Sequence, residues 1–266
     1  MSDTQGRMIH SDYWNGHLVK IFDNGDHRSL YFGSGHLQSR MSLSRPHELI
    51  LSYTRYMAAA LLIQPVPARI LVIGIGAGSF VRFFHYHYKD CLIDAVDCSP
   101  QVIAAARGYF HLAEEDRRVR IFCRDGLEFL INETKKIYDL ILVDAFDDRG
   151  MAPTIYDAPF FRLCRERLSE DGVVSCNLWS DDQVRFREIK STLAAVFAGC
   201  LFLPVPDRGN VIALAMPFAV PWSRIYAKSS EIAERKKRFG IDFRQLTGSI
   251  KQNNLSMTKR WIARLS

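Results

Sequence analysis

Residues 70–80 read Ile-Leu-Val-Ile-Gly-Ile-Gly-Ala-Gly-Ser-Phe, an apolar run followed by three glycines at alternate positions. Such a run is typical of a buried strand that turns sharply into a helix, because glycine adopts backbone conformations closed to other residues. A second apolar run, 92–96, ends at Asp97, about 20 residues after the glycines. A carboxylate at this distance is typical of nucleoside binding at the carboxyl edge of a parallel sheet.

The chain after this point alternates predicted strands and helices. Further strands are predicted at 119–123, 138–143 and 172–178, and an antiparallel pair is predicted at 201–204 and 210–215. Strands that alternate with helices indicate a parallel sheet covered by helices on both faces. The expected fold class is therefore α/β, with a doubly wound, mostly parallel sheet.

Three segments are expected along the chain. Residues 1–45 are predicted to form a small N-terminal β appendage, because apolar residues alternate on both sides of an Asn-Gly pair, which is typical of a tight hairpin. Residues 46–222 are predicted to form the main domain, and residues 223–266 a basic, helical extension. A helix capped by Ser44 and continuing to Leu62 is predicted to open the main domain.

The composition fits one large folded domain and excludes several classes of protein. The chain has 266 residues, of which 48% are hydrophobic, and this is enough for a full core. No apolar run reaches the roughly 18 residues of a membrane helix, and the N-terminus shows no secretory leader. The six cysteines show no C-x-x-C pair and no histidine spacing suited to zinc, so reduced thiols, a cytoplasmic location and no metal are expected.

The net charge of +6 is distributed unevenly. Eleven Lys and Arg residues and three acidic residues lie from Pro221 onward, so the last segment is strongly basic and the rest of the chain slightly acidic. An acidic body suits a cationic substrate. A basic extension suits either an anionic partner or a solvated helix face.

Acidic residues follow three of the predicted parallel strands. Asp97, Asp125 and Asp144 each stand at a strand's carboxyl end, where open parallel sheets bind their ligands. Asp97 is predicted to bind ribose hydroxyls. Asp125 is predicted to receive the amino group of adenine, with Gly126 letting the base lie close, unless Asp125 only caps the helix that follows.

Asp144 begins an acidic cluster that also contains Asp147 and Asp148. Neighbouring carboxylates raise one another's pKa unless a cation lies between them. No His or Cys stands nearby in the sequence to favour a metal, so a cationic amine is the expected ligand of this cluster. The alternative interpretation is a surface loop with scattered acids.

Together these motifs resemble the spermidine/spermine synthase family, within the class I S-adenosylmethionine-dependent transferases. The resemblance extends from about Phe22 to Pro217 and includes the glycine loop, Asp97, Asp125-Gly126 and a strand ending in Leu-Val-Asp-Ala-Phe-Asp. It implies a co-substrate, either S-adenosylmethionine or decarboxylated S-adenosylmethionine. It also implies a small, polyamine-type amine as the acceptor, and a homodimer.

The resemblance assigns roles to individual residues. Asp144 is the expected catalytic base, Asp147 the acid that holds the amine, and Gln38 a residue near the tail of the donor. Independently of the resemblance, Tyr53 and Tyr156 are predicted to line the amine site through apolar or cation–π contacts, and the alternative interpretation is that each belongs to the core. The expected donor-binding residues are Gly74, Gly76, Gly78, Asp97, Asp125 and Gly126.

Three functions remain open at this point. Transfer of an aminopropyl group from a sulfonium donor to a small amine is favoured. A methyltransferase acting on a small molecule or RNA is the second, because Ala77 replaces an aspartate with which the family holds the donor's amino group, and because basic residues suit phosphate contacts. The third is a non-catalytic nucleoside-binding homologue.

Overall fold

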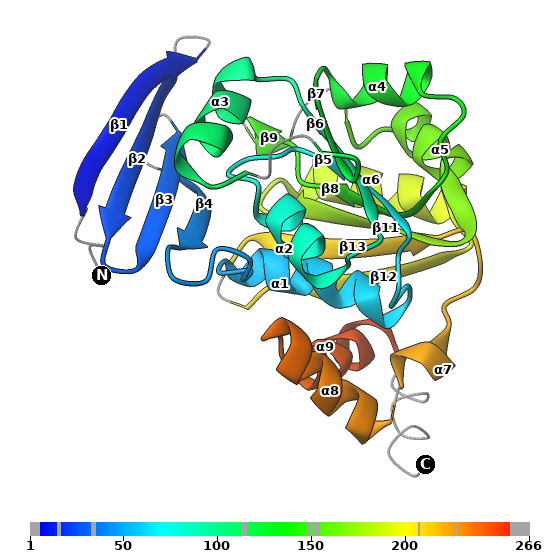
Figure 1. The fold of residues 1–266 in the computed structure, drawn as a ribbon. Helices are drawn as coiled ribbons and strands as arrows, with labels where there is room; N and C mark the ends of the chain where they lie inside the picture. The colour runs from blue at the N-terminus through cyan, green and yellow to red at the C-terminus, as the bar shows by residue number, and fades with distance from the viewer. Residues whose placement is uncertain are drawn as a thin grey trace.

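The chain folds into an N-terminal antiparallel sheet, a central sheet covered by helices, and a C-terminal layer of helices (Figure 1). The structure is a computed structural model. It describes residues 6–14, 17–32, 36–112, 116–147, 150–151, 155–206, 208–226 and 228–255.

The N-terminal sheet has four strands in the order β1-β2-β3-β4. They are β1 (Arg7–Trp14), β2 (His17–Asn24), β3 (His27–Phe32) and β4 (His36–Ser42). The predicted hairpin is present, since Asn24 pairs with His27 and Gly25 has a φ of 58°. Apolar side chains of this sheet, among them Val19 and Leu30, pack in one cluster with Phe110 of the main domain.

The central sheet has seven strands in the order β12-β13-β11-β8-β5-β6-β7. They are β5 (Arg69–Ile73), β6 (Leu92–Asp97), β7 (Val119–Cys123), β8 (Tyr138–Val143), β11 (Leu168–Trp179), β12 (Gly199–Pro204) and β13 (Asn210–Met216). Pairing is parallel from β11 to β7, and β13 is antiparallel to both β11 and β12. The predicted α/β class with a mostly parallel sheet is confirmed.

Helices cover both faces of this sheet. They are α1 (Ser52–Met57), the 3₁₀ helix η1 (Ala58–Leu62), α2 (Ser79–His87), α3 (Pro100–Tyr109), α4 (Gly126–Asn132), α5 (Ala158–Glu166) and α6 (Gln183–Val196). Alternate residues of β5 supply the two cores. Ile70 and Val72 pack with α1 and α2, while Leu71 and Ile73 pack with α4, α5 and α6. This alternation follows from the two-residue period of a strand buried on both faces.

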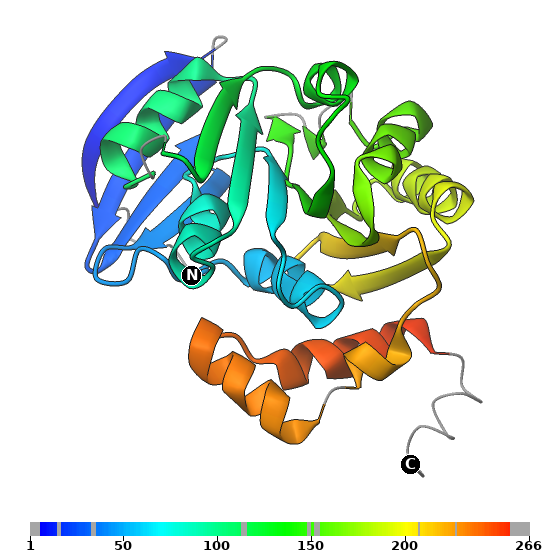
Figure 2. The same cartoon turned by 45° about the vertical axis from the view of Figure 1, so that its right-hand side comes forward.

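A C-terminal layer of helices lies against the first of these faces (Figure 2). It contains α7 (Trp222–Ile225), α8 (Ser229–Phe239) and α9 (Phe243–Asn254). Asn254 pairs with the edge strand β12: its Nδ2 donates to the Phe202 carbonyl at 2.9 Å, and its Oδ1 accepts from the Phe202 amide at 2.7 Å. The side chain thus replaces a neighbouring strand and covers an open sheet edge. None of the helices within the described ranges is long and apolar enough to cross a membrane.

The helix predicted to start after Ser44 is wrong in its first turns, since α1 begins only at Ser52. Ser44 instead binds the β2–β3 turn, where its amide and hydroxyl both donate to the Asp26 carboxylate. The guanidinium of Arg55 donates to the carbonyls of Leu49 and Ile50, which satisfies these groups outside a helix. Hydrogen bonds to the side chains of Asp26 and Arg55 therefore take the place of the backbone hydrogen bonds of a helix in this segment.

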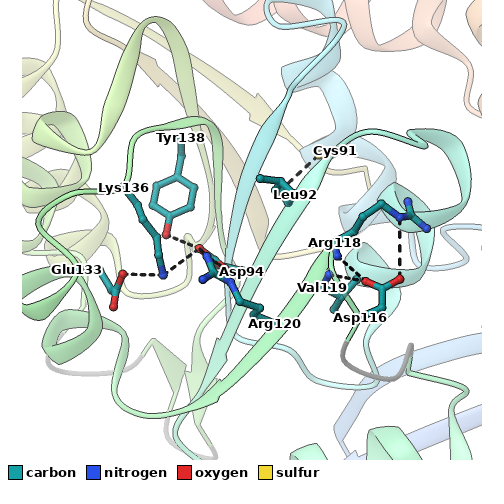
Figure 3. A network of polar contacts seen from close by, with 10 residues as sticks. All are labelled: Cys91, Leu92, Asp94, Asp116, Arg118, Val119, Arg120, Glu133, Lys136 and Tyr138. Atoms are coloured by element: carbon teal, nitrogen blue, oxygen red, sulfur yellow. Dashed lines mark hydrogen bonds and ion pairs between the residues drawn. The ribbon is translucent and has the colours of Figure 1, made fainter.

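A buried carboxylate joins three strands of the central sheet (Figure 3). Asp94 of β6 is 2% exposed; it accepts from the Tyr138 hydroxyl at 2.8 Å and from Arg120 Nε at 2.9 Å. Lys136 Nζ lies 3.4 Å from the same carboxylate and 2.6 Å from Glu133. A buried charge is tolerated when it is paired and hydrogen-bonded in this way.

Asp94→Ala is expected to lower the free energy of unfolding by about 3 kcal/mol, because it leaves the buried Tyr138 hydroxyl without its acceptor and removes one of the two carboxylates that pair with Lys136. Denaturant unfolding measures this loss. The control is Asp171→Ala, since Asp171 forms an exposed pair with Arg224, and a loss below about 1 kcal/mol is expected there. Equal losses in the two variants would contradict this account of the Asp94 network.

Candidate active site at the carboxyl edge of the sheet

The glycine loop between β5 and α2 packs directly on the end of β8. Gly74, Gly76 and Gly78 all have positive φ values, of 89°, 50° and 77°. A Cβ on Gly74 would collide with the carbonyl oxygen of Asp144. The backbone amide of Asp144 donates to the Ile73 carbonyl at 2.8 Å, which holds the two segments together. Glycine is therefore required at position 74 both by its φ and by the closeness of the Asp144 backbone.

The N-terminal sheet also reaches the glycine loop. The amide of Ala77 donates to Ser39 Oγ of β4 at 3.1 Å, and a Cβ on Gly76 would lie 2.8 Å from the same oxygen. Gln38, the preceding residue of β4, accepts from the Tyr53 hydroxyl at its backbone carbonyl, at 3.3 Å. The structure thus brings Gln38 and Tyr53 together beside the loop.

Asp97 ends β6 next to the same loop, as its position in the sequence predicted. Its Oδ2 accepts from the Ile75 amide at 2.9 Å and its Oδ1 from the Ser99 amide at 3.0 Å. Burial raises the pKa of this carboxyl, and the backbone amides that donate to it act in the opposite direction. The carboxylate therefore holds the loop and the start of α3 in place. Ribose binding stays a prediction.

Asp125 performs the capping role that the sequence left open. Its Oδ1 accepts from the amides of Leu127 and Glu128 at 2.9 and 3.1 Å, which satisfies the first turn of α4. A Cβ on Gly126 would lie 2.5 Å from Ile73 Cγ2, so the strand core requires glycine there. Contact of Asp125 and Gly126 with adenine stays a prediction.

Asp144 stands at the carboxyl end of β8, between side chains from two other elements. Asn177 of β11 donates from Nδ2 to Asp144 Oδ1 at 2.9 Å. Burial raises the pKa of Asp144 to about 6, while hydrogen bonds from Asn177 and Tyr53 favour the ionised form. A carboxylate with this pKa accepts protons more readily than an ordinary aspartate and is still mostly ionised at neutral pH.

Tyr156 lies in the core close to Asp144. Its side chain is 1% exposed, and within the part of the chain that the structure describes its hydroxyl meets no hydrogen-bond geometry with another group. Burial is the main cause that raises the pKa of this phenol, and the charge of Asp144 contributes. The φ of Tyr156 is 76°, a conformation that costs energy for a residue other than glycine and is found often at functional sites.

The rest of the predicted acidic cluster lies at the limit of what the structure describes. The backbone of Asp147 belongs to a short hairpin of β9 (Phe146–Asp147) and β10 (Gly150–Met151). The side chain of Asp147 and all of Asp148 lie outside the described residues. The predicted role of Asp147 in holding an amine therefore stays a prediction.

Three polar residues of this edge were missed in the sequence: Ser39, Asn177 and Asn210. Asn210 of β13 donates from Nδ2 to Asn177 Oδ1 at 2.9 Å, and so extends the contact with Asp144 across a third strand. The available signal was the position of Asn177 inside the apolar run 173–179, because a polar side chain in a buried strand needs a hydrogen-bond partner.

The fold of this chain is shared with solved structures of a methyltransferase-like protein and of spermidine synthases. Human methyltransferase-like protein 13 in complex with SAH matches with a TM-score of 0.57 and 23% identity, over 73% of this chain and 89% of that one. A spermidine synthase in complex with the transition-state analogue AdoDATO matches with a TM-score of 0.75 and 20% identity, over 98% of this chain and 89% of that one. At these identities the likeness establishes the fold alone.

Sequence comparison establishes the family. The model of the spermine/spermidine synthase domain matches residues 51–207. Polyamine aminopropyltransferases of Neisseria meningitidis serogroup A and Chromobacterium violaceum are each 37% identical to this chain, over 89% of it and 90% of the relative. The chain belongs to the spermine/spermidine synthase family, and the resemblance seen in the sequence is confirmed.

Proposed function

We propose that this protein is a polyamine aminopropyltransferase. It transfers the aminopropyl group of decarboxylated S-adenosylmethionine to a small, cationic amine. The observation that carries this proposal is the carboxylate of Asp144, which has a raised pKa and stands beside the glycine loop at the sheet's ligand-binding edge. The relatives named polyamine aminopropyltransferases support it over most of the chain.

The reaction is a displacement at the propyl carbon bonded to the sulfonium sulfur. The lone pair of the amine forms the new C–N bond, while the C–S pair returns to sulfur and leaves neutral 5′-methylthioadenosine. Positive charge thereby moves from sulfur to nitrogen, and the new ammonium releases one proton. Alignment of the nitrogen with the carbon in a preformed site contributes roughly 7–11 kcal/mol to such a reaction.

Asp144 is the group that receives this proton and balances the growing positive charge. The attacking amine must be unprotonated, although a free alkyl amine has a pKa of about 10.4. A partly desolvated carboxylate interacts strongly with an ammonium, since the local dielectric is low. Asp147 is proposed to hold a second cationic end of the acceptor, and Gln38 to lie near the tail of the donor.

Asp144→Asn is expected to lower kcat by about 10²–10⁴-fold, because an amide does not accept the proton. In the wild-type enzyme, kcat/KM should fall as the pH drops through about 6, where Asp144 becomes protonated, and not near the value of an ordinary aspartate. Steady-state assays across pH measure both effects.

The melting temperature is the control for this variant. Burial of an ionised Asp144 costs stability, so Asp144→Asn should fold with an unchanged or higher melting temperature at pH 8. Two results would rule out Asp144 as the base: a fall of kcat/KM in the wild-type enzyme only near pH 4, or undiminished turnover in the folded variant.

Ala77 gives a second candidate, a methyltransferase that uses S-adenosylmethionine itself. Its side chain is 0% exposed and packs with apolar residues of the N-terminal sheet, so it offers the donor no polar group. The proposed function instead predicts tighter binding of the decarboxylated donor. Calorimetric titration with both donors decides between the two activities, and a preference for S-adenosylmethionine would favour methyl transfer.

Three properties of the assembly and its surroundings stay predictions from the sequence: a homodimer, a cytoplasmic location and the lack of a metal. The six cysteines are free in the structure, which is compatible with a reducing compartment. The acceptor is proposed only as a chemical class, a small amine with a second cationic end.

A further inference from the structure

We infer that Asn210 is a positioning residue for the proposed reaction. It acts through Asn177, whose amide it orients so that an N–H group, and not a carbonyl oxygen, faces Asp144. The inference rests on the proposed function, because it concerns the group assigned as the base. It goes further, because it assigns part of the control of the pKa of Asp144 to a residue of β13, which lies two strands away from β8 in the sheet.

The three side chains form a chain of hydrogen bonds across adjacent strands. Asn210 Nδ2 of β13 donates to Asn177 Oδ1 at 2.9 Å, and Asn177 Nδ2 of β11 donates to Asp144 Oδ1 at 2.9 Å. The order of the sheet places β13, β11 and β8 side by side, and Asp144 follows directly after β8. Both bonds have ordinary lengths for N–H···O contacts.

The direction of donation along this chain is fixed by chemistry. An ionised carboxylate only accepts hydrogen bonds, so Asn177 must present its NH₂ group to Asp144. The amide oxygen of Asn177 then points the other way and requires a donor, which is the NH₂ group of Asn210. The two halves of an amide have nearly the same shape. Without Asn210, the amide oxygen of Asn177 loses its donor, and only the contact with Asp144 still holds the amide in this orientation.

The two asparagine side chains are buried, so they lower the stability of the fold unless their polar groups are hydrogen-bonded. Asn177 is 3% exposed and Asn210 is 8% exposed, and the neighbours of Asn177 in β11, Cys176 and Leu178, are both 0% exposed. A buried amide without partners costs stability. The two buried asparagines satisfy each other and, through Asn177, the carboxylate at the edge of the sheet.

The consequence for Asp144 follows from the groups that face it. Burial raises the pKa of Asp144, and the hydrogen bonds from Asn177 and from Tyr53 of α1 lower it. The phenols of Tyr53 and Tyr156 both have pKa values raised by burial, so neither titrates between pH 5 and 9. The side chains of Asp147 and Asp148 lie outside the described residues and are the same in every variant compared below.

The test is the pH dependence of kcat/KM for Asn210→Leu with decarboxylated S-adenosylmethionine and a diamine. Loss of the orienting contact should move the acidic limb upward by about one pH unit, which lowers kcat/KM about five-fold at pH 6 and leaves it nearly unchanged at pH 9. The acceptor's own ionisation is the same for both enzymes, so the difference reports on the protein. The KM for the donor should not change.

Ser175→Ala is the matched control. Ser175 lies two residues before Asn177 on β11, is fully buried, and donates to the Met57 carbonyl at 3.1 Å. Its loss removes a buried hydrogen bond from the same strand without touching the chain that ends at Asp144. A lower melting temperature with an unmoved acidic limb is expected. If Asn210→Leu behaves in the same way, Asn210 has a structural role only and the inference is wrong.

Two further measurements keep the inference separate from its premises. If Asn210→Leu does not fold, Asn210→Ala replaces it, because alanine removes the amide without adding bulk. The same upward shift of the acidic limb is expected. The carboxyl ¹³C signal of Asp144, assigned with Asp144→Asn, should titrate at a higher pH in the Asn210 variant, whether or not the enzyme transfers aminopropyl groups. An unshifted signal would overturn the inference alone, while a wild-type enzyme without aminopropyl transfer would overturn the proposed function alone.

Discussion

The structure of the candidate active site depends on the close approach of two backbones, those of Gly74 and Asp144. The end of β8 packs on the turn after β5 so tightly that any side chain at position 74 would strike the Asp144 carbonyl. This contact places the proposed base directly beside the loop proposed to bind the donor. The positive φ of Gly74 makes the turn available to glycine but strained for other residues.

Most of the sheet could be predicted from the sequence, because strands buried on both faces are short apolar runs with glycine or an acid at the end. The run 138–143 is a strand with the same bounds in the structure. The start of α1 could not be predicted, because Ser44 binds Asp26, a residue of the β2–β3 turn, and does not cap a helix. Local patterns do not contain such a partner.

The candidate site divides along the same line. The positions of Asp97 and Asp144 at the strand ends could be predicted, because position at a strand end is a local property and parallel strands bring such positions together. The cap formed by Asp125 was a stated alternative and is present in the structure, while contact with adenine stays a prediction. Asn177 and Asn210 were missed, because their pairing depends on which strands become neighbours, and the order β13-β11-β8 is not local information.

The most direct test of the account is product analysis after incubation with decarboxylated S-adenosylmethionine and a panel of small diamines. Mass spectrometry should find an acceptor heavier by one aminopropyl group, together with an equal amount of 5′-methylthioadenosine. Methylated products formed from S-adenosylmethionine, with no aminopropyl product from any diamine of the panel, would contradict it.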